Sequence, residues 1–265
     1  MSASDRLSLA ERRRYYRAAL DFADASRRAI TRAVRAGFRK RLKADQSYVT
    51  DADLSAERAL RTAIHRTFPD HGILGEELSP VNPTADFQWI LDPIDGTLSF
   101  THGIPFFGTI IGLHHRGRPI VGVIDYPALD TRFSAGLGLG AWRDGQRLRI
   151  RDARPDLLRE VISASDRPRF VLCRRGQAFD RLLRTHPQVR GYADCLGHTL
   201  AAEGRIGAAV DYGLKLWDLA ATQLLVEEAG GRYVCLHTSR RGGQTIFGIV
   251  CGKPSVVDWL VGIFR

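Results

Sequence analysis

The spacing of apolar residues predicts two long amphipathic helices in the N-terminal part of the chain. Tyr16, Leu20 and Ile30 recur near the helical period of about 3.6 residues, and Ser8 followed by Glu11 has the spacing of a capping box. The predicted elements here are a helix over about 8–37, a polar loop over 39–48, and a second helix that follows residues 49–53 and stops at 68–69.

Short apolar runs in the middle of the chain predict β-strands. The run from Phe87 to Leu91 predicts a buried strand, and we expect Asp92-Pro93 to stop it. The other predicted strands are one over 71–77, an antiparallel hairpin over 106–113 and 120–124, and a meander that extends the hairpin to about 145. His114 and His115 fall in the predicted turn of the hairpin, where we expect no metal role.

From about residue 151 the pattern changes to alternating strands and helices. The predicted strands are 160–164, 170–173, 206–210, 232–236 and 247–251, and the predicted helices are 179–183, 196–204, 219–229 and a terminal one after residue 254. The sequence therefore predicts an α/β (α+β) chain made of two halves, 1–150 and 151–265, that pack together without a hinge.

Composition adds constraints on where the protein works. Hydrophobic residues make up 44% and charged residues 26%, as in ordinary globular proteins. No apolar run approaches the ~20 residues of a membrane span, and Met1 to Arg6 lack the apolar segment of a secretory signal. The four cysteines lie far apart without a CxxC pair, so we expect reduced thiols in a cytoplasmic protein.

The net charge of +10 is compatible with a basic module that binds nucleic acid. However, basic residues are spread from Arg6 to Arg265, and their densest clusters, at 12–14 and 39–43, accompany a helical pattern. A solvated basic helix face explains these clusters better and still allows a general attraction for anionic substrates. We therefore expect no nucleic-acid partner and no membrane partner.

The stretch from Asp92 to Thr97 carries the strongest chemical signal. Asp92 and Asp95 end a buried apolar run, where two nearby carboxylates repel each other unless a cation neutralises them. Carboxylate oxygens suit Mg²⁺, and the amides of Gly96 and Thr97 are suited to hold a phosphate. An ordinary strand end with an Asp-Gly turn would also have this pattern.

Five acidic residues fall at the ends of predicted strands or the starts of predicted helices. They are Asp53, Glu76, Asp92, Asp95 and Asp218. Each has a simpler explanation when taken alone; Asp218, for example, precedes the predicted helix 219–229 and has the position of an N-cap. Together they match a known pattern.

Three short segments, in order, resemble the signatures of the inositol monophosphatase superfamily of metal-dependent phosphomonoesterases. They are Gly75-Glu76-Glu77, Asp92-Pro93-Ile94-Asp95-Gly96-Thr97, and Trp217-Asp218-Leu219-Ala220-Ala221 with Glu227-Glu228-Ala229-Gly230-Gly231 after it. The resemblance extends over nearly the full length of the chain. It implies a layered αβαβα fold, usually a homodimer, that hydrolyses a phosphate monoester as one catalytic unit with two or three Mg²⁺.

The resemblance also assigns roles to residues. Its metal ligands are Glu76, Asp92, the carbonyl of Ile94, Asp95 and Asp218. Thr97, assisted by Asp53, matches the pair that activates water, and Glu76 is also expected near the nucleophile. The amides of Gly96 and Thr97 are expected to hold the phosphate.

Several details resemble the histidinol-phosphatase branch of the superfamily. Lys43, a further candidate site residue, begins the pattern Lys43-x-Asp45-x-Ser47-x-Val49-Thr50-x-x-Asp53, which resembles that branch and the adenosine bisphosphate phosphatases. Asp194 has the position of an acidic residue in that branch and is a plausible partner for the amine of L-histidinol phosphate. Asp211 is the second candidate substrate contact. The open alternatives are that Asp194 caps a helix near Leu196 and that Asp211 ends a strand.

Other details depart from that branch. Leu196 replaces an aromatic residue, and His102-Gly103-Ile104-Pro105 is more similar to the inositol-type enzymes. Hydrolysis of inositol 1-phosphate, or of a related sugar or nucleotide phosphate, is therefore the alternative activity. His198 is expected to be a core residue without a catalytic role.

Overall fold

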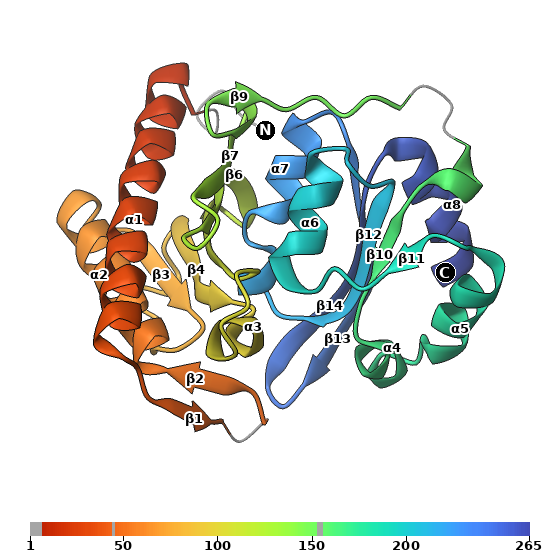
Figure 1. Cartoon of the computed structure of the whole chain (residues 1–265). Helices are drawn as coiled ribbons and strands as arrows, with labels where there is room; N and C mark the ends of the chain where they lie inside the picture. The colour runs from red at the N-terminus through yellow and green to blue at the C-terminus, as the bar shows by residue number, and fades with distance from the viewer. Residues whose placement is uncertain (1–6, 44–45, 153–155) are drawn as a thin grey trace.

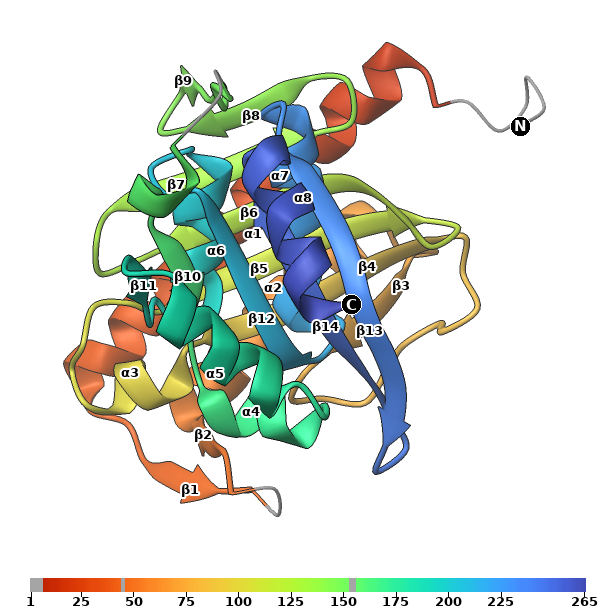
Figure 2. The same cartoon turned by 90° about the vertical axis from the view of Figure 1, so that its right-hand side faces the viewer.

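Three layers of helices enclose two β-sheets, so the predicted αβαβα arrangement is confirmed (Figure 1). The structure is a computed structural model that describes residues 7–43, 46–152 and 156–265. Helices α1 and α2 cover one face of a seven-stranded sheet, and α7 covers its other face. Helices α6 and α7 also contact a five-stranded sheet, whose far face is covered by α4 and α8 (Figure 2).

Helices make up three of the five layers. Among the described residues they are α1 (Leu9–Ala36), α2 (Asp51–Thr67), α3 (Thr97–Thr101), α4 (Arg167–Leu172), α5 (Gly176–Thr185), α6 (Asp194–Ala202), α7 (Thr222–Glu228) and α8 (Pro254–Phe264), with 3₁₀ turns at Leu157–Arg159 and Trp217–Leu219. The predicted capping box of α1 is present, because the Ser8 hydroxyl accepts from the Glu11 amide and the Glu11 carboxylate accepts from the Ser8 amide.

The larger sheet has the strand order β3-β4-β5-β6-β7-β8-β9. Its strands are β3 (Gly72–Gly75), β4 (Phe87–Asp95), β5 (Gly108–His115), β6 (Arg118–Tyr126), β7 (Thr131–Gly136), β8 (Gly140–Arg143) and β9 (Gln146–Arg147). Strands β3 and β4 are parallel, and every later neighbouring pair is antiparallel, which confirms the predicted hairpin and meander.

The smaller sheet has the order β11-β10-β12-β14-β13. Its strands are β10 (Ile162–Ala164), β11 (Val189–Arg190), β12 (Ala208–Leu214), β13 (Arg232–Arg241) and β14 (Gln244–Gly252). The two sheets thus draw on different parts of the chain, before residue 148 and after residue 161. The division into halves at residue 150 stays a prediction.

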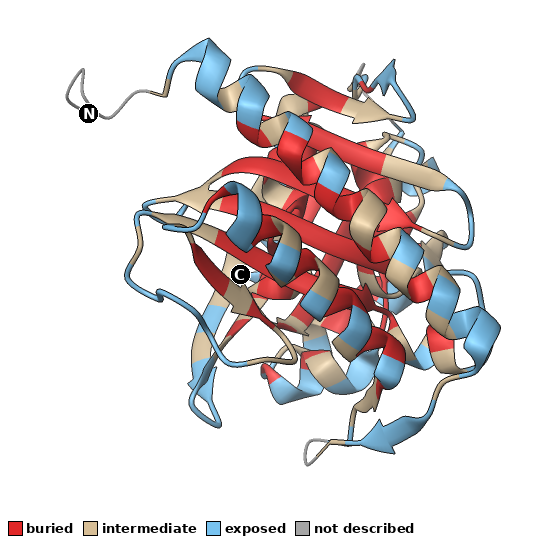
Figure 3. Ribbon diagram, turned by 90° about the vertical axis from the view of Figure 1, so that its left-hand side faces the viewer, coloured by how far each residue is buried: buried red, intermediate tan, exposed pale blue. Residues whose placement is uncertain are grey.

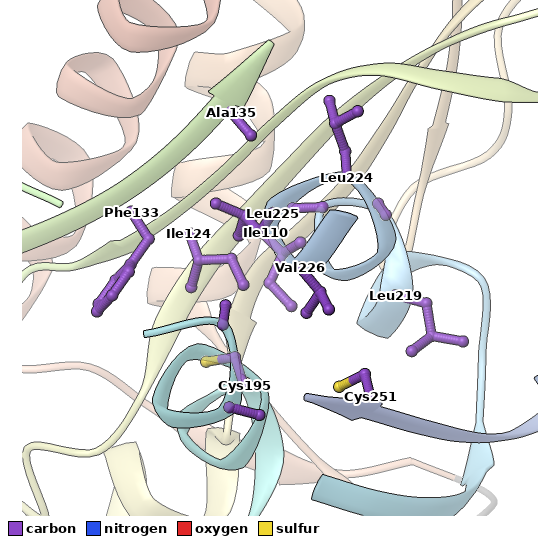
Figure 4. Packing of buried hydrophobic residues seen from close by; sticks show 14 of the residues in the cluster. Ile110, Ile124, Phe133, Ala135, Cys195, Leu219, Leu224, Leu225, Val226 and Cys251 are labelled. Atoms are coloured by element: carbon purple, nitrogen blue, oxygen red, sulfur yellow. The ribbon is translucent and has the colours of Figure 1, made fainter. Parts of the chain in front are cut away.

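The core lies on both faces of the larger sheet. Figure 3 shows the buried segments concentrated along its strands and on the inner face of α1. The cluster between the two sheets is built on α7, whose Leu224, Leu225 and Val226 pack against Ile110 and Ile124 of the larger sheet (Figure 4). Burial of this kind contributes most of the favourable free energy of folding.

Two predicted elements are wrong in kind. The predicted polar loop over 39–48 contains a small antiparallel hairpin, β1 (Lys40–Leu42) with β2 (Tyr48–Thr50), although residues 44–45 lie outside the described part of the chain. The predicted strand over 170–173 belongs to helix α4, which has Pro168 in its first turn, where proline suits a helix. Phe170 is fully buried in α4, whereas Val171 and Leu172 of the same apolar run are exposed, as expected for successive residues of a helix with one buried face.

Several predicted boundaries also differ from the structure, and three of these differences have a clear structural reason. Strand β4 continues past Asp92-Pro93 to Asp95, because its pairing with β5 shifts register there and needs no proline amide. His114 and His115 belong to strand β5, and the turn lies after them, at Arg116-Gly117. The helix predicted over 219–229 is divided into a 3₁₀ turn at Trp217–Leu219 and α7, which begins only at Thr222.

Two further sequence expectations concern the whole chain. All four cysteines are free thiols, as predicted. Across the described parts of the chain, no helix combines the length and apolar character needed to cross a bilayer.

A Gly112→Ala substitution is expected to lower the free energy of unfolding by about 1–3 kcal/mol. A β-carbon at Gly112 would lie 2.3 Å from the carbonyl oxygen of Ala220, because the backbone before α7 closely approaches the sheet there. Urea unfolding measures the change. Gly262→Ala is the matched control, since no atom lies within 4 Å of its added β-carbon. Equal stability of the two variants would contradict this reading of the packing.

Candidate active site

The centre of the site is the end of strand β4. Pairing with β5 shifts between Asp92, which lies opposite Ile110, and Asp95, which lies opposite Gly108. The Thr109 hydroxyl donates to the carbonyl of Pro93 at 2.8 Å and so satisfies a backbone acceptor within the irregular stretch. This bulge brings both aspartates into one pocket, since residues three apart on a regular strand point to opposite faces.

Asp218 completes a cluster of three carboxylates. Oxygen atoms of Asp92, Asp95 and Asp218 all lie within 4.8 Å of one another. Asp218 lies in the 3₁₀ turn before α7, where its Oδ2 accepts from the amide of Lys215 at 2.8 Å. It therefore does not cap a helix at 219, and the N-cap explanation of Asp218 is wrong.

The cluster is electrostatically unfavourable without a cation. Burial, and then the charges of Glu76 and Asp95, raise the pKa of Asp92 well above its usual value. Burial, and then Glu76, raise the pKa of Asp218 to about 7. Asp92 Oδ1 is also buried without a hydrogen-bond partner among the described residues. Hard oxygen donors with uncompensated charge fit divalent cations such as Mg²⁺, so the residues present suit the metal that the resemblance implies.

Glu76 lines the same pocket from the segment that follows β3. Its backbone amide donates to the carbonyl of Leu91 at 3.1 Å, next to Asp92. Its Oε1 accepts from the ammonium of Lys43 at 2.9 Å, and the same ammonium donates to Glu77 at 2.6 Å. The candidate Lys43 thus lies beside the acidic site and is paired with Glu76, although it does not line the pocket.

The pair Thr97 and Asp53 meets at the edge of hydrogen-bonding distance. The Thr97 hydroxyl lies 2.9 Å from the carbonyl of Ile94, a predicted metal ligand, and 3.5 Å from Asp53 Oδ1. Asp53 is buried in the first turn of α2, where its Oδ2 accepts from the amide and the hydroxyl of Thr50. Burial raises the pKa of Asp53 to about 6, against the effect of these hydrogen bonds.

Gly96 allows the backbone to turn into α3. Its φ is 82°, and an added β-carbon would lie 3.0 Å from the carbonyl of Phe106 and 3.1 Å from a carboxylate oxygen of Asp194. Only glycine adopts this conformation in so little space without strain. The amides of Gly96 and Thr97 at this turn are not used within α3, as a phosphate cradle requires.

Asp194 stands where the smaller half of the chain reaches the cluster. It is the first residue of α6, has a φ of 57°, and makes no capping hydrogen bond, so the alternative that it caps this helix is wrong. The first amide of α6 that finds a side-chain acceptor is that of Cys195, which donates to Asp95 Oδ2 at 2.5 Å. Asp194 is therefore left facing the pocket.

One pocket of about 360 Å³ contains most of the predicted site residues. Its lining includes Glu76, Asp92, Ile94, Asp95, Gly96, Thr97, Asp194 and Asp218. Asp211 is not on its wall. It lies buried within β12, where its Oδ1 accepts from the amide of Tyr212 and its Oδ2 is 4.0 Å from His198 Nε2, so it does not end the strand. His198 is buried in the core, as expected.

Sequence reasoning missed Arg169 and Asp166. Both line the pocket, and their side chains form an ion pair at 3.2 Å near the start of α4. Asp166 has a φ of 28°, which is strained for a residue other than glycine. The only available signal was the spacing of three residues between Asp166 and Arg169, which is typical of an ion pair on a helix. This signal was not used because a strand was predicted over 170–173.

The free energy of unfolding of the metal-free protein is expected to fall as pH rises from 5 to 8. Burial raises the pKa of Asp211 to about 7, above its value near 3.8 in the unfolded chain, so the folded state binds more protons across this window. Stability is then greatest below about pH 4 for this group and is lost as it ionises. Urea unfolding at pH 5 and pH 8 measures the loss, on the order of 2 kcal/mol for Asp211. Asp211→Asn should make the profile less steep, while Asp53 and Asp218, whose pKa values are also raised, keep part of the dependence. An unchanged profile would contradict the assignment.

Comparison with known proteins agrees with this geometry. Residues 11–261 match the model of the inositol monophosphatase family. A histidinol-phosphatase of Chlorobaculum parvum is 38% identical over 189 residues, 71% of this chain and 73% of that protein. An inositol-1-monophosphatase of Rhizobium meliloti is 34% identical over 227 residues, 83% of each chain. The structure of an inositol monophosphatase from Zymomonas mobilis superposes with a TM-score of 0.79 at 27% identity, covering 95% of this chain and 98% of the other.

Proposed function

The chain belongs to the inositol monophosphatase family of phosphoric monoester hydrolases, and from that premise we propose that it hydrolyses L-histidinol phosphate to L-histidinol. The proposal includes a cytoplasmic enzyme of histidine biosynthesis that acts as a homodimer. The choice of substrate rests on the carboxylate of Asp194, which makes no helix-capping hydrogen bond and faces the pocket beside Gly96. The similarity to a histidinol-phosphatase supports the same choice.

Asp194 suits a substrate that bears both a phosphate and an amine. Its carboxylate would lie 3.1 Å from a β-carbon at Gly96, so it is adjacent to the proposed phosphate cradle. A protonated amine near the phosphate ester would therefore contact the anionic carboxylate of Asp194 and not an uncharged side chain. A charge-assisted hydrogen bond of this kind is stronger than a contact with a neutral hydroxyl.

The residues that would hold Mg²⁺, two or three ions per site, are Glu76, Asp92, the carbonyl of Ile94, Asp95 and Asp218. Bound there, Mg²⁺ supplies charge neutralisation for the phosphoryl oxygens and lowers the pKa of a bound water. The protein contributes the arrangement of its donors, which the bulge of β4 and the turn at Trp217–Leu219 fix before substrate arrives.

Thr97 and Asp53 are proposed to orient the attacking water. In this proposal ionised Asp53 accepts a hydrogen bond from the Thr97 hydroxyl, so that a lone pair of the Thr97 oxygen can accept a hydrogen bond from that water. The 3.5 Å separation of the two side chains is short enough to close into a hydrogen bond in the substrate complex. The amides of Gly96 and Thr97 would donate to the phosphate oxygens, and Glu76, which lines the same pocket, would lie near the water.

Phosphate release in the presence of Mg²⁺ from a panel of esters tests the proposal. The panel holds histidinol phosphate, inositol 1-phosphate, fructose 1,6-bisphosphate and adenosine 3′,5′-bisphosphate. We expect a kcat/KM for histidinol phosphate that exceeds the others by at least about a hundredfold, because only this ester carries a protonated aliphatic amine for Asp194. Equal or faster release from inositol 1-phosphate would overturn the proposed substrate.

Inositol 1-phosphate is the alternative substrate, and a specific observation favours it. Asp211 lies in β12, the strand that comes just before the candidate ligand Asp218 in the sequence. The chain is also 34% identical to an inositol-1-monophosphatase over most of its length. Asp211 is buried and does not line the pocket, so direct contact with a polyol is less favourable there than contact with Asp194. The ester panel separates the two activities.

A further inference from the structure

Helix α2 presents three charged side chains at intervals of four residues. They are Asp53, Glu57 and Arg61. Residues at this spacing lie one above another on the same face of a helix. Asp53 faces Thr97, as described above, whereas Glu57 and Arg61 contact the segment that carries Glu76. One helix face therefore contacts two separate parts of the proposed site.

Glu57 binds the main chain immediately after Glu76. Its Oε2 accepts from the amide of Glu77 at 2.9 Å, and its Oε1 accepts from the amide of Leu78 at 3.2 Å. The Glu57 carboxylate is fully buried, so these amides form two of the few contacts that compensate its charge. Charge-assisted hydrogen bonds in a buried setting restrain a loop more strongly than neutral ones.

Arg61 holds the other end of the same segment. Its Nε donates to Glu57 Oε1 at 2.8 Å, and its two terminal nitrogens donate to the carbonyls of Leu78 and Ser79, each at 2.9 Å. The guanidinium thus neutralises Glu57 and satisfies two main-chain acceptors at once. A lysine could not reproduce this planar set of donors.

The glycine of the segment Gly75-Glu76-Glu77 fits this arrangement. A β-carbon at Gly75 would lie 2.0 Å from Glu57 Oε1 and 2.4 Å from its carboxylate carbon. Any larger residue would displace Glu57 or the main chain. The contact explains why a glycine stands directly before Glu76.

We propose that Glu57 and Arg61 are positioning residues that hold the 76–79 main chain so that the Glu76 carboxylate faces Asp92. Opposite the Glu57 contact, the amide of Glu76 is bonded to Leu91, so the segment is fixed both to α2 and to β4. The inference rests on the proposed function, because it takes Glu76 as a metal ligand. It adds that the geometry of this ligand depends on two residues that do not line the pocket.

Two measurements test the proposal without relying on turnover. The first is Mn²⁺ binding to the intact protein, followed by electron paramagnetic resonance; the second is hydrogen exchange of the Glu77 and Leu78 amides. Glu57→Gln and Arg61→Met are each expected to weaken Mn²⁺ binding and to speed amide exchange by roughly tenfold to a hundredfold, the range for loss of a buried hydrogen bond to a charged group. Arg61→Lys should be less severe than Arg61→Met, with part of the Mn²⁺ affinity and part of the amide protection retained.

The controls distinguish this role from general destabilisation. Arg58→Gln removes a charge from the exposed side of α2 and should leave both measurements unchanged. Glu76→Gln defines the Mn²⁺ affinity of a site without that ligand. If Glu57→Gln and Arg61→Met bind Mn²⁺ like the unmodified protein while Glu76→Gln does not, the positioning role is overturned. If Glu76→Gln also binds normally, the proposed ligand is wrong and the inference falls with it.

Should Glu57→Gln fail to fold, Arg61→Met still decides the question. Arg61 is partly exposed, with 14% of its side chain accessible, and methionine keeps its aliphatic contacts. Loss of Mn²⁺ affinity in a folded Arg61→Met protein supports the proposal. Retained affinity together with unchanged exchange at Leu78 contradicts it.

Discussion

Asp92→Asn is expected to lower kcat by on the order of a thousandfold or more while the protein stays folded. Asp92 contributes to a cluster in which three carboxylates lie within 4.8 Å, and its Oδ1 has no partner among the described residues. An asparagine has nearly the same shape but cannot neutralise a divalent cation. Phosphate release at saturating Mg²⁺ and substrate measures the loss, and Asp218→Asn should have a similar effect.

The same substitution should raise the melting temperature of the metal-free protein. Burial and the neighbouring charges of Glu76 and Asp95 disfavour ionised Asp92, so removing the charge relieves repulsion in the folded state. Asp21→Asn on the exposed side of α1 is the control and should change neither activity nor stability. Retained turnover in both Asp92→Asn and Asp218→Asn would remove the metal-centred mechanism.

Asp194→Asn is expected to reduce kcat/KM for histidinol phosphate by roughly tenfold to a hundredfold and to leave inositol 1-phosphate within a few-fold. The reason is that an ammonium loses its anionic partner, whereas a hydroxyl can bond equally well to an amide. Asparagine is the right substitution because Asp194 has a φ of 57°, a conformation that asparagine also tolerates.

Asp166→Asn is the matched comparison for that experiment. Asp166 lines the same pocket but is paired with Arg169, so its charge is already compensated. It should affect the two substrates about equally. A loss of the same size for both substrates in Asp194→Asn would show that Asp194 shapes the pocket without recognising an amine.

The sequence was sufficient to predict the elements whose signals are local. Signals between neighbouring residues predicted the capping box of α1 and the hairpin of β5 and β6. The order of the acidic segments can likewise be read directly from the sequence. The layered arrangement also follows, but through the resemblance of short segments to a known family. Periodicity alone would not have distinguished it from other α/β folds.

What could not be predicted depends on contacts between distant segments. Strand β4 continues through Pro93 because Thr109 and the shifted pairing of β5 accommodate it, and neither is visible in the local sequence. Arg169 was missed because its place in the pocket depends on the packing of α4 against β12. Asp218 was predicted to precede a helix directly. It lies instead in a 3₁₀ turn before α7, where its carboxylate accepts a hydrogen bond from the amide of Lys215.

The hydrogen bond from the Cys195 amide to Asp95 spans 100 residues of sequence. During synthesis on a ribosome, the segment around β4 emerges well before α6 and before Asp218. A nascent chain at that stage has two neighbouring aspartates without the third carboxylate and without the amide that fixes Asp95. Tight retention of a divalent ion should therefore begin only when the C-terminal strands have assembled, which makes metal uptake a late reporter of folding and not its trigger.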